Sequence, residues 1–206
     1  MLRHVLSTAD VDVNIQDSNG WTALHHACKY GDIEIVKIIV KAQASINKFS
    51  NTGFYPIHIA ALNNNEDIIE YLVKDLKDEH GDTIKGADLE SQTTRLCTPL
   101  HLAAKKGNNA SMKTILELGG NIYARDHRKW TALHYAAFHG HSKSISLLCK
   151  WDAETEKLRA MKNSQDKRAD EIIKSDRNKH AFISKDFVAR NVNVISYMVC
   201  MQDWKD

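Results

Sequence analysis

Apolar residues recur at three- and four-residue intervals in several separate stretches of this chain. The first stretch runs from Ile33 to Val40, where Val36, Ile39 and Val40 would share one face of a helix. Equivalent stretches are Asp67 to Val73, Ala110 to Leu118 and Ser142 to Leu148. Charged residues such as Glu34 and Lys37 lie between the apolar positions, so the pattern predicts amphipathic helices that each bury one face against a neighbouring element.

A short signature precedes each of these predicted helices. Its four copies are Thr22-Ala23-Leu24-His25, Tyr55-Pro56-Ile57-His58, Thr98-Pro99-Leu100-His101 and Thr131-Ala132-Leu133-His134. Small residues follow each copy, and then comes a residue suited to ending a helix: Gly31, Asn64, Gly107 and Gly140. Glycine and asparagine enter the left-handed conformation at helix ends more readily than other residues. We therefore expect a first helix between each signature and the amphipathic helix that follows it.

The signatures begin at residues 22, 55, 98 and 131, so the spacing is 33 residues at both ends of the series and 43 in the middle. A T-P-L-H-x-A pattern with a period of 33 residues is typical of ankyrin repeats, and the chain resembles an ankyrin-repeat protein over roughly residues 1–174. This resemblance implies an all-α fold, an ankyrin-repeat α-solenoid of stacked helix pairs with β-turn or hairpin connectors.

The resemblance also implies a domain organisation. It consists of a partial repeat (1–20), repeats at about 21–53, 54–96, 97–129 and 130–157, a degenerate terminal repeat (158–174) and a C-terminal tail (175–206) that caps the stack or binds a partner. The insertion at 75–85 is expected to continue the preceding helix as far as Gly81. Residues 150–168 are expected to extend the fourth repeat as a helix, with Trp151 packed or docked. Leu96 and Lys129 stand where other connectors have Gly20 and Gly53, so those two tips are expected to adopt another turn.

Composition narrows the function. A net charge of +2, from 28 basic and 26 acidic residues, gives no global attraction to nucleic acid or membranes, and we expect neither nucleic-acid binding nor membrane insertion. The cysteines form no C-x-x-C pair. We expect Cys28 and Cys149 to be buried and Cys97 to be exposed. This usage favours a reducing compartment: the cytoplasm, with the nucleus, cytoskeleton or cilium left open.

The histidines are interpreted as structural. In ankyrin proteins the signature histidine bonds connector backbone of a neighbouring repeat, which implies this role for His25, His58, His101 and His134. A cluster of His134, His139 and His141 lacks an adjacent cysteine or carboxylate set, so no metal is expected there. No phosphate loop, H-E-x-x-H or G-x-S-x-G motif occurs. The sequence therefore predicts no catalytic residues, no cofactor and no enzyme activity.

The resemblance places partner contacts at connector tips and at the ends of the first helices. The residues at those offsets are Trp21, Tyr30, Phe54, Leu62, Lys105, Lys106, Arg128, Trp130 and Phe138. Aromatic residues dominate interface energetics, so we expect a concave groove with two aromatic lobes and a cationic centre. Such a groove fits a peptide with hydrophobic and acidic residues. The alternative interpretation is that the rings pack on their own connectors.

The expected function is protein–protein recognition as an adaptor, scaffold or inhibitor. Two alternatives stay open: a structural subunit of a cytoskeletal, ciliary or other large assembly, and the soluble ankyrin portion of a larger channel or regulatory enzyme. The apolar run from Val192 to Met201 and the start inside a repeat favour a fragment or an assembly subunit. The chain is thus expected to be a monomer or a subunit of a hetero-assembly.

Overall fold

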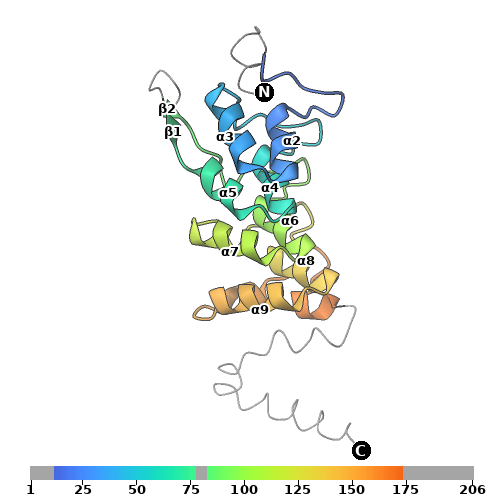
Figure 1. Ribbon diagram of the computed structural model, residues 1–206. Coiled ribbons are helices and arrows are strands. Elements are labelled where there is room, and N and C mark those ends of the chain that lie inside the picture. The colour runs from blue at the N-terminus through green and yellow to red at the C-terminus, as the bar shows by residue number, and fades with distance from the viewer. Residues whose placement is uncertain (1–11, 78–82, 174–206) are drawn as a thin grey trace, which may run out of the picture.

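The computed structural model describes residues 12–77 and 83–173. Helices pair and stack into one elongated column, and the connectors between pairs project from one side of it (Figure 1). The elements are α2 (Ala23–Tyr30), α3 (Ile33–Lys41), α4 (Pro56–Leu62), α5 (Glu66–Val73), β1 (Leu76–Lys77), β2 (Thr83–Ile84), α6 (Pro99–Lys106), α7 (Asn109–Glu117), α8 (Ala132–His139), α9 (Ser142–Trp151), α10 (Lys157–Ala160) and the 3₁₀ helix η1 (Ala169–Ile172). The predicted ankyrin-type solenoid is confirmed. The expectations for residues 1–11 and for the tail at 175–206 lie outside the described residues.

Each repeat contributes a first helix (α2, α4, α6 or α8) and a second helix (α3, α5, α7 or α9). The first helices pack against one another along the column, and each also packs on its own second helix. Left-handed residues separate the two helices of a pair, as at Gly31 (φ 79°) and Gly107 (φ 75°). This tight turn makes the helices antiparallel, so apolar faces meet inside the pair.

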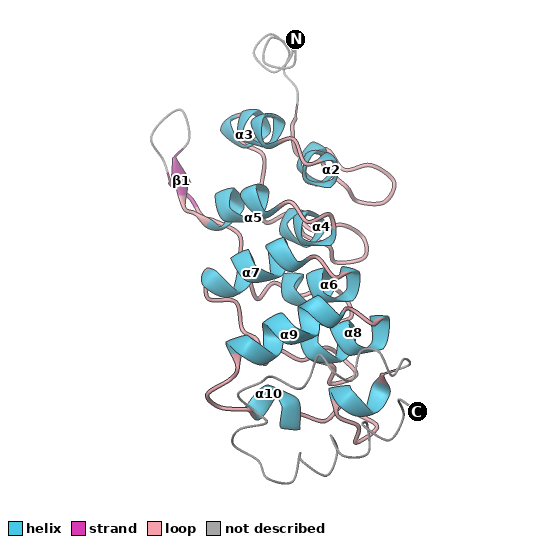
Figure 2. Cartoon of the chain, turned by 60° about the horizontal axis from the view of Figure 1, so that its bottom comes forward, coloured by secondary structure: helices cyan, strands magenta, loops and turns pink. Residues whose placement is uncertain are grey.

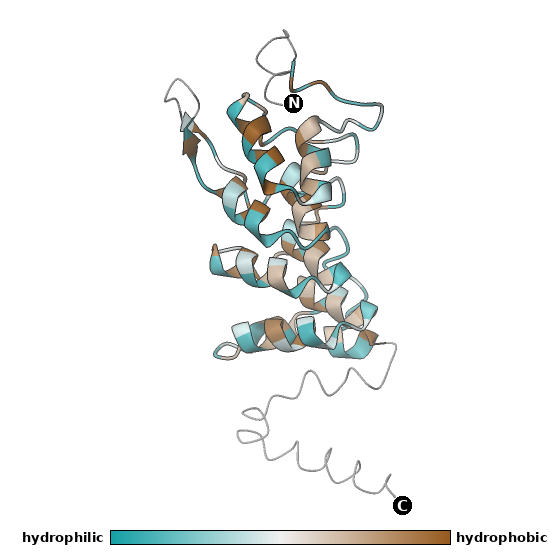
Figure 3. Ribbon diagram, in the orientation of Figure 1, coloured by the Kyte–Doolittle hydropathy of each residue, from teal (hydrophilic) through white to brown (hydrophobic). Residues whose placement is uncertain are grey.

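The core lies between the two layers of helices. Val36, Ile39 and Val40 are buried on α3, as their spacing predicts. α3 is also one of the most hydrophobic segments in Figure 3. Cys28 and Cys149 are buried as expected, whereas the expectation for Cys97 is wrong. Its exposed fraction is 5 %, and its Sγ atom lies 3.5 Å from the Tyr135 hydroxyl on α8.

The connectors share one turn. In the first, the Asp17 N–H donates to the Trp21 carbonyl oxygen at 2.8 Å. Matching bonds join Ser50 to Phe54, Thr93 to Cys97 and Asp126 to Trp130, at 2.8, 3.0 and 2.9 Å. The residue before the last one is left-handed in every case: Gly20 (φ 76°), Gly53 (φ 74°), Leu96 (φ 57°) and Lys129 (φ 58°). The prediction of a different turn at Leu96 and Lys129 is therefore wrong, and these two residues carry the strain that glycine avoids.

Successive connectors are joined by hydrogen bonds at their tips. The Asn51 N–H donates to the Asn19 carbonyl oxygen at 3.0 Å, and the His127 N–H donates to that of Arg95 at 3.2 Å. Close approach also explains one glycine, since a Cβ atom on Gly20 would lie 2.6 Å from the Asn51 backbone nitrogen. The connectors therefore form a continuous ladder along one side of the stack.

The insertion forms a two-stranded hairpin. α5 ends at Val73, where the chain becomes extended. β1 and β2 pair antiparallel, with Leu76 opposite Ile84. Gly86 then brings the chain back beside α5, where a Cβ atom would lie 2.2 Å from the Val73 carbonyl oxygen. The prediction that the insertion continues the preceding helix is wrong, and Gly81 lies outside the described ranges.

The last described repeat also folds in the pattern of its predecessors. The Asn163 N–H donates to the Lys167 carbonyl oxygen at 2.9 Å, as in the earlier connectors. Glu171 stands in the place of the signature histidine, and its carboxylate accepts the N–H of Arg168 at 2.6 Å. η1 packs on α8, and the short helix α10 also lies at this end of the described column (Figure 2).

Residues 150–168 do not extend α9 as predicted. α9 ends at Trp151, and the next residue, Asp152, is buried. Its carboxylate accepts hydrogen bonds from the Thr155 hydroxyl and, at 2.7 Å, from the Leu158 N–H. These bonds turn the chain toward α10 and leave the Trp151 ring 46 % exposed.

Candidate functional site

The signature histidines connect neighbouring repeats. Nδ1 of His25 accepts the Thr22 N–H at 3.1 Å, while Nε2 donates to the Phe54 carbonyl oxygen of the next connector at 2.9 Å. The other three signature histidines make the same pair of bonds. Nε2 of His58, His101 and His134 donates to the carbonyl oxygens of Cys97, Trp130 and Lys167 at 3.0, 3.0 and 3.1 Å. A neutral ring with one donor and one acceptor nitrogen satisfies both groups.

Burial favours that neutral state. It lowers the pKa of His58 to about 4, and it also lowers the pKa values of His25, His101 and His134. Both nitrogens of each ring are already bonded, so none is free to bind a ligand. No group of three or more His, Cys, Asp or Glu residues within 12–77 and 83–173 could hold a metal ion.

The exposed face of the first helices, with the connectors beside it, is the remaining candidate site. We call it the first-helix face. The sequences of α2, α4, α6 and α8 contain no aspartate or glutamate. At their ends lie the exposed lysines Lys29, Lys105 and Lys106, and no ion pair between described residues involves them.

The second helices have a different charge pattern. Two of their exposed lysines pair with carboxylates one turn away: Lys37 with Glu34 at 2.7 Å, and Lys113 with Glu117 at 3.5 Å. Such pairs neutralise the outer face locally. The exposed lysines Lys41 on α3 and Lys143 and Lys150 on α9 have no ion pair among the described residues. The helices of the first-helix face therefore carry positive charge without any carboxylate, whereas α3, α5 and α7 carry carboxylates as well.

An open aromatic cluster lies at the first repeat. Tyr30 is 77 % exposed at the end of α2, and Trp21 is half-buried before its start. The Lys29 ammonium lies 5.9 Å from the Trp21 ring centroid and 5.7 Å from that of Tyr30. Two rings and a cation thus face solvent together, an arrangement that suits an apolar or aromatic side chain of a partner.

The expected second aromatic lobe is closed. Trp130 is only 9 % exposed. The Arg128 guanidinium carbon lies 4.5 Å from its ring centroid, and Tyr135 and Phe138 meet the ring edge-to-face at 5.2 and 5.3 Å. The expectation of an open Trp130 ring therefore fails, because side chains from α8 and from its own connector cover it. Phe138 is half-buried in the same cluster.

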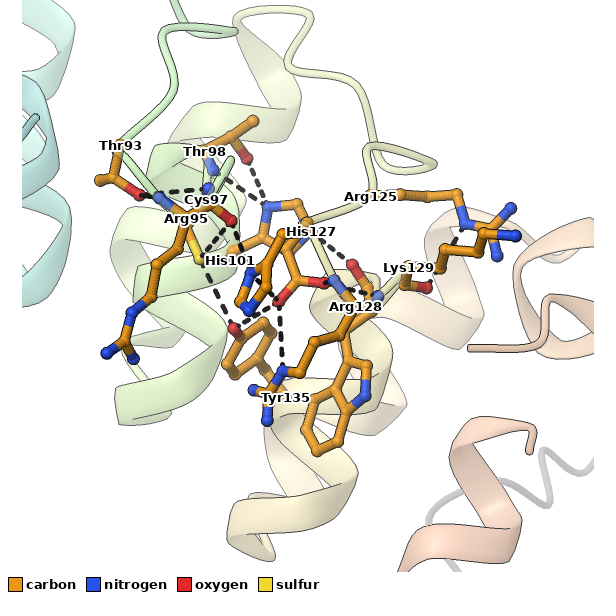
Figure 4. A network of polar contacts seen from close by, with 12 residues as sticks. Thr93, Arg95, Cys97, Thr98, His101, Arg125, His127, Arg128, Lys129 and Tyr135 are labelled. Atoms are coloured by element: carbon orange, nitrogen blue, oxygen red, sulfur yellow. Dashed lines mark hydrogen bonds and ion pairs between the residues drawn. The ribbon is translucent and has the colours of Figure 1, made fainter. Parts of the chain in front are cut away.

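A buried carboxylate fixes the fourth connector under this cluster (Figure 4). Asp126 Oδ1 accepts the N–H groups of Arg128 and Trp130, both at 2.8 Å, and Oδ2 accepts the Tyr135 hydroxyl at 2.8 Å. Burial raises the pKa of Tyr135 well above its usual value, and bonds to Cys97 and Asp126 act in the same direction. Both carboxylate oxygens of Asp126 already accept hydrogen bonds, so the network holds the connector in place.

The middle of the first-helix face is neutral. Phe54 and Leu62 are half-buried and pack against the core, while Asn63 is exposed. Sequence reasoning missed one exposed ring, Phe49, which is 57 % exposed and lies 5.7 Å from the Tyr55 ring. Its signal was an aromatic residue in a polar connector, next to a signature that begins with tyrosine instead of threonine.

Comparisons with known proteins agree with this architecture. The family model described as "Ankyrin repeats (3 copies)" matches residues 1–84 and 76–159, so the chain belongs to the ankyrin-repeat family. Ankyrin repeats generally mediate protein–protein interactions and are generally non-catalytic. No helix within the described ranges is long and apolar enough to span a membrane.

Three curated relatives illustrate the range of proteins that carry such repeats. The chain is 31 % identical over 133 residues to human transient receptor potential cation channel subfamily A member 1. It is 30 % identical over 142 residues to the probable 26S proteasome regulatory subunit p28 of Saccharomyces cerevisiae, and 29 % identical over 116 residues to protein VAPYRIN-LIKE of Medicago truncatula. These matches cover 65, 67 and 56 % of this chain, but only 11, 58 and 23 % of the relatives.

Proposed function

We propose that this chain is a non-catalytic protein-recognition module that acts as an adaptor, scaffold or inhibitor and binds its partner on the first-helix face. The observation that carries the proposal is the charge of that face. Its helices hold no carboxylate, its lysines have no ion pairs among the described residues, and Tyr30 lies open beside Lys29. A peptide segment with hydrophobic and acidic residues complements this surface.

The contact residues in this proposal are Trp21, Tyr30, Lys105, Lys106 and Arg128. Phe54, Leu62, Trp130 and Phe138 support the face from below, because they are half-buried or buried. Free thiols at the described cysteines support a cytoplasmic location.

A second candidate is a subunit of a larger assembly or the ankyrin portion of a larger channel. The names of two relatives favour it, since one is a proteasome regulatory subunit and the other a cation channel. The two candidates share the same binding face and differ in what the chain is attached to.

Site-specific photo-crosslinking tests the binding face. A benzophenone amino acid replaces Tyr30 or Lys106, and as a matched control it replaces Lys113 on the outer side of α7. We expect the first two positions to crosslink the same protein in native lysate, and Lys113 not to do so. A protein captured from Lys113, or equally from all three positions, would place binding elsewhere.

A further inference from the structure

The ends of the first helices form one row of equivalent positions. Tyr30, Asn63 and Lys106 occupy it in the first three repeats, since the signatures that precede them are offset by the same number of residues. All three side chains are exposed. α2 packs on α4, and α4 packs on α6. The three residues therefore lie in order along the first-helix face.

The chemistry changes along this row. It begins with an aromatic ring at Tyr30, passes through the neutral amide of Asn63 and reaches an ammonium at Lys106, next to Lys105. The connector tips change in the same direction. The first two tips carry no lysine or arginine, whereas the third carries Arg95 and the fourth carries Arg128 and Lys129.

The fourth connector adds positive charge, and its own carboxylate is not available to neutralise that charge. Its carboxylate, Asp126, is buried and accepts three hydrogen bonds. The Arg128 guanidinium approaches it only to 3.9 Å and lies over the Trp130 ring. The third and fourth repeats thus present cations, and the first repeat presents the open rings.

We propose that the partner segment is bipartite, with an aromatic or aliphatic anchor against Tyr30 and Trp21 and an acidic cluster against Lys105 and Lys106. This inference rests on the proposed function and specifies its ligand. It replaces the two-lobed groove expected from the sequence, since the cover of Arg128, Tyr135 and Phe138 over Trp130 removes the second anchor position.

Helix packing fixes the spacing between the two parts. Packed helices lie about 8–10 Å apart, so the two steps from α2 to α6 span about 18 Å. An extended peptide covers about 3.3 Å per residue. The anchor and the acidic cluster are therefore separated by about five or six residues.

Designed peptides test the spacing. Each fluorescein-labelled peptide carries one tryptophan and three consecutive glutamates, joined by a Gly/Ser spacer of about two, about six or about twelve residues, in both orders. Fluorescence anisotropy at low salt measures binding to the full chain. We expect the spacer of about six residues, in one of the two orders, to bind about tenfold more tightly than the shortest spacer, because both contacts then form on one molecule.

Variants assign the two contacts. Tyr30→Ala is expected to abolish the gain in affinity that the tryptophan provides. The double variant Lys105→Glu, Lys106→Glu is expected to abolish the gain in affinity that the glutamates provide. Lys113→Glu on the opposite face is the matched control and should leave binding unchanged.

Three results would overturn the bipartite ligand. The first is equal binding at all spacings, and the second is no binding by any peptide at about 100 μM protein. The third is a single-stranded oligonucleotide that binds more tightly than the peptides and whose affinity is unchanged by Tyr30→Ala. Crosslinking of one protein from Tyr30 and Lys106 would still stand in the first two cases. Failure of the bipartite ligand is thus distinguishable from failure of the binding face.

Discussion

The Tyr135 hydroxyl donates to Oδ2 of Asp126 across 2.8 Å, and both groups are buried. This bond joins α8 to the connector of its own repeat. The counterparts of Tyr135 in the earlier repeats are His26, Ile59 and Leu102, so the fourth repeat alone among these uses a phenol at this position. The hydroxyl also lies 3.5 Å from Cys97 Sγ of the preceding connector.

Replacing Tyr135 by phenylalanine should therefore destabilise the fourth repeat. The change keeps the ring but leaves a buried carboxylate oxygen with one donor fewer, at a cost of about 1–3 kcal/mol. Urea unfolding followed by circular dichroism measures the loss. Tyr30→Phe is the control, because the exposed Tyr30 hydroxyl can bond to water. Equal stability of wild type and Tyr135→Phe would show that the Asp126 network does not support the connector.

Acid should weaken the stack through its buried histidines. Burial lowers the folded-state pKa of His58 from 6.5 to about 4. Below pH 6.5 His58 is protonated in the unfolded chain but stays neutral in the folded protein. The stability contributed by neutral His58 is thus complete above pH 6.5 and is lost as pH falls toward 4. The loss from this one residue is about 3 kcal/mol, and the lowered pKa values of His25, His101 and His134 act in the same direction.

Urea midpoints measured at pH 7.5, 6 and 5 test this dependence. His58→Gln keeps a donor that can reach the Cys97 carbonyl oxygen but does not titrate in this range. It should be less stable than wild type at pH 7.5 and should lose less stability on acidification. A wild-type midpoint that does not move between pH 7.5 and 5 would contradict neutral, buried signature histidines.

Much of the fold could be predicted from the sequence because its elements are fixed by local chemistry. His25 and Thr22 are close in the chain, so their cap can be recognised as a motif, and Gly31 or Gly107 marks a helix end by its conformational freedom. The apolar spacing of Val36, Ile39 and Val40 reports burial directly. Each of these signals depends on a few adjacent residues.

The failures depend on contacts that are distant in sequence or on weak local preferences. The insertion begins with charged residues that suit a helix, and its hairpin depends on pairing between Leu76–Lys77 and Thr83–Ile84. The candidate site was predicted at Trp130, but its burial depends on Tyr135 and Phe138 from α8 and on Arg128 from the connector. The turn at Asn163 lacks both glycine and an aromatic residue, so its sequence gave no sign of a complete connector.

Glycine at the fourth connector tip should stabilise the protein. Lys129 is left-handed (φ 58°) in a turn where Gly20 and Gly53 have the same conformation. Lys129→Gly removes strain of about 1 kcal/mol, and Lys129→Ala is the control because it removes the charge but keeps the Cβ atom. Gly53→Ala should destabilise, since its Cβ atom would lie 2.6 Å from the Thr94 backbone nitrogen. Thermal unfolding should give the highest melting temperature for Lys129→Gly and the lowest for Gly53→Ala. Equal melting temperatures for Lys129→Gly and Lys129→Ala would show that the backbone of Lys129 is not strained.

Two buried serines at equivalent positions should respond differently to the same substitution. Ser111 on α7 and Ser144 on α9 are both fully buried. The Ser144 hydroxyl donates to Asn109 Oδ1 at 2.8 Å, whereas the Ser111 hydroxyl has no hydrogen-bond partner among the described residues. Ser144→Ala should cost about 1 kcal/mol, because it leaves the Asn109 oxygen short of a donor.

Ser111→Ala should be neutral or stabilising by up to about 1 kcal/mol, since it removes a buried polar group that nothing satisfies. The pair is its own control, because the substitution, the helix position and the burial are the same in both repeats. Chemical unfolding of the two single variants and of the double variant measures each effect and their additivity. A loss of stability for Ser111→Ala as large as that for Ser144→Ala would mean that the Ser111 hydroxyl is hydrogen-bonded in the folded protein, by water or by a shifted neighbour such as Asn64, whose Oδ1 accepts the Ser111 backbone N–H at 3.3 Å.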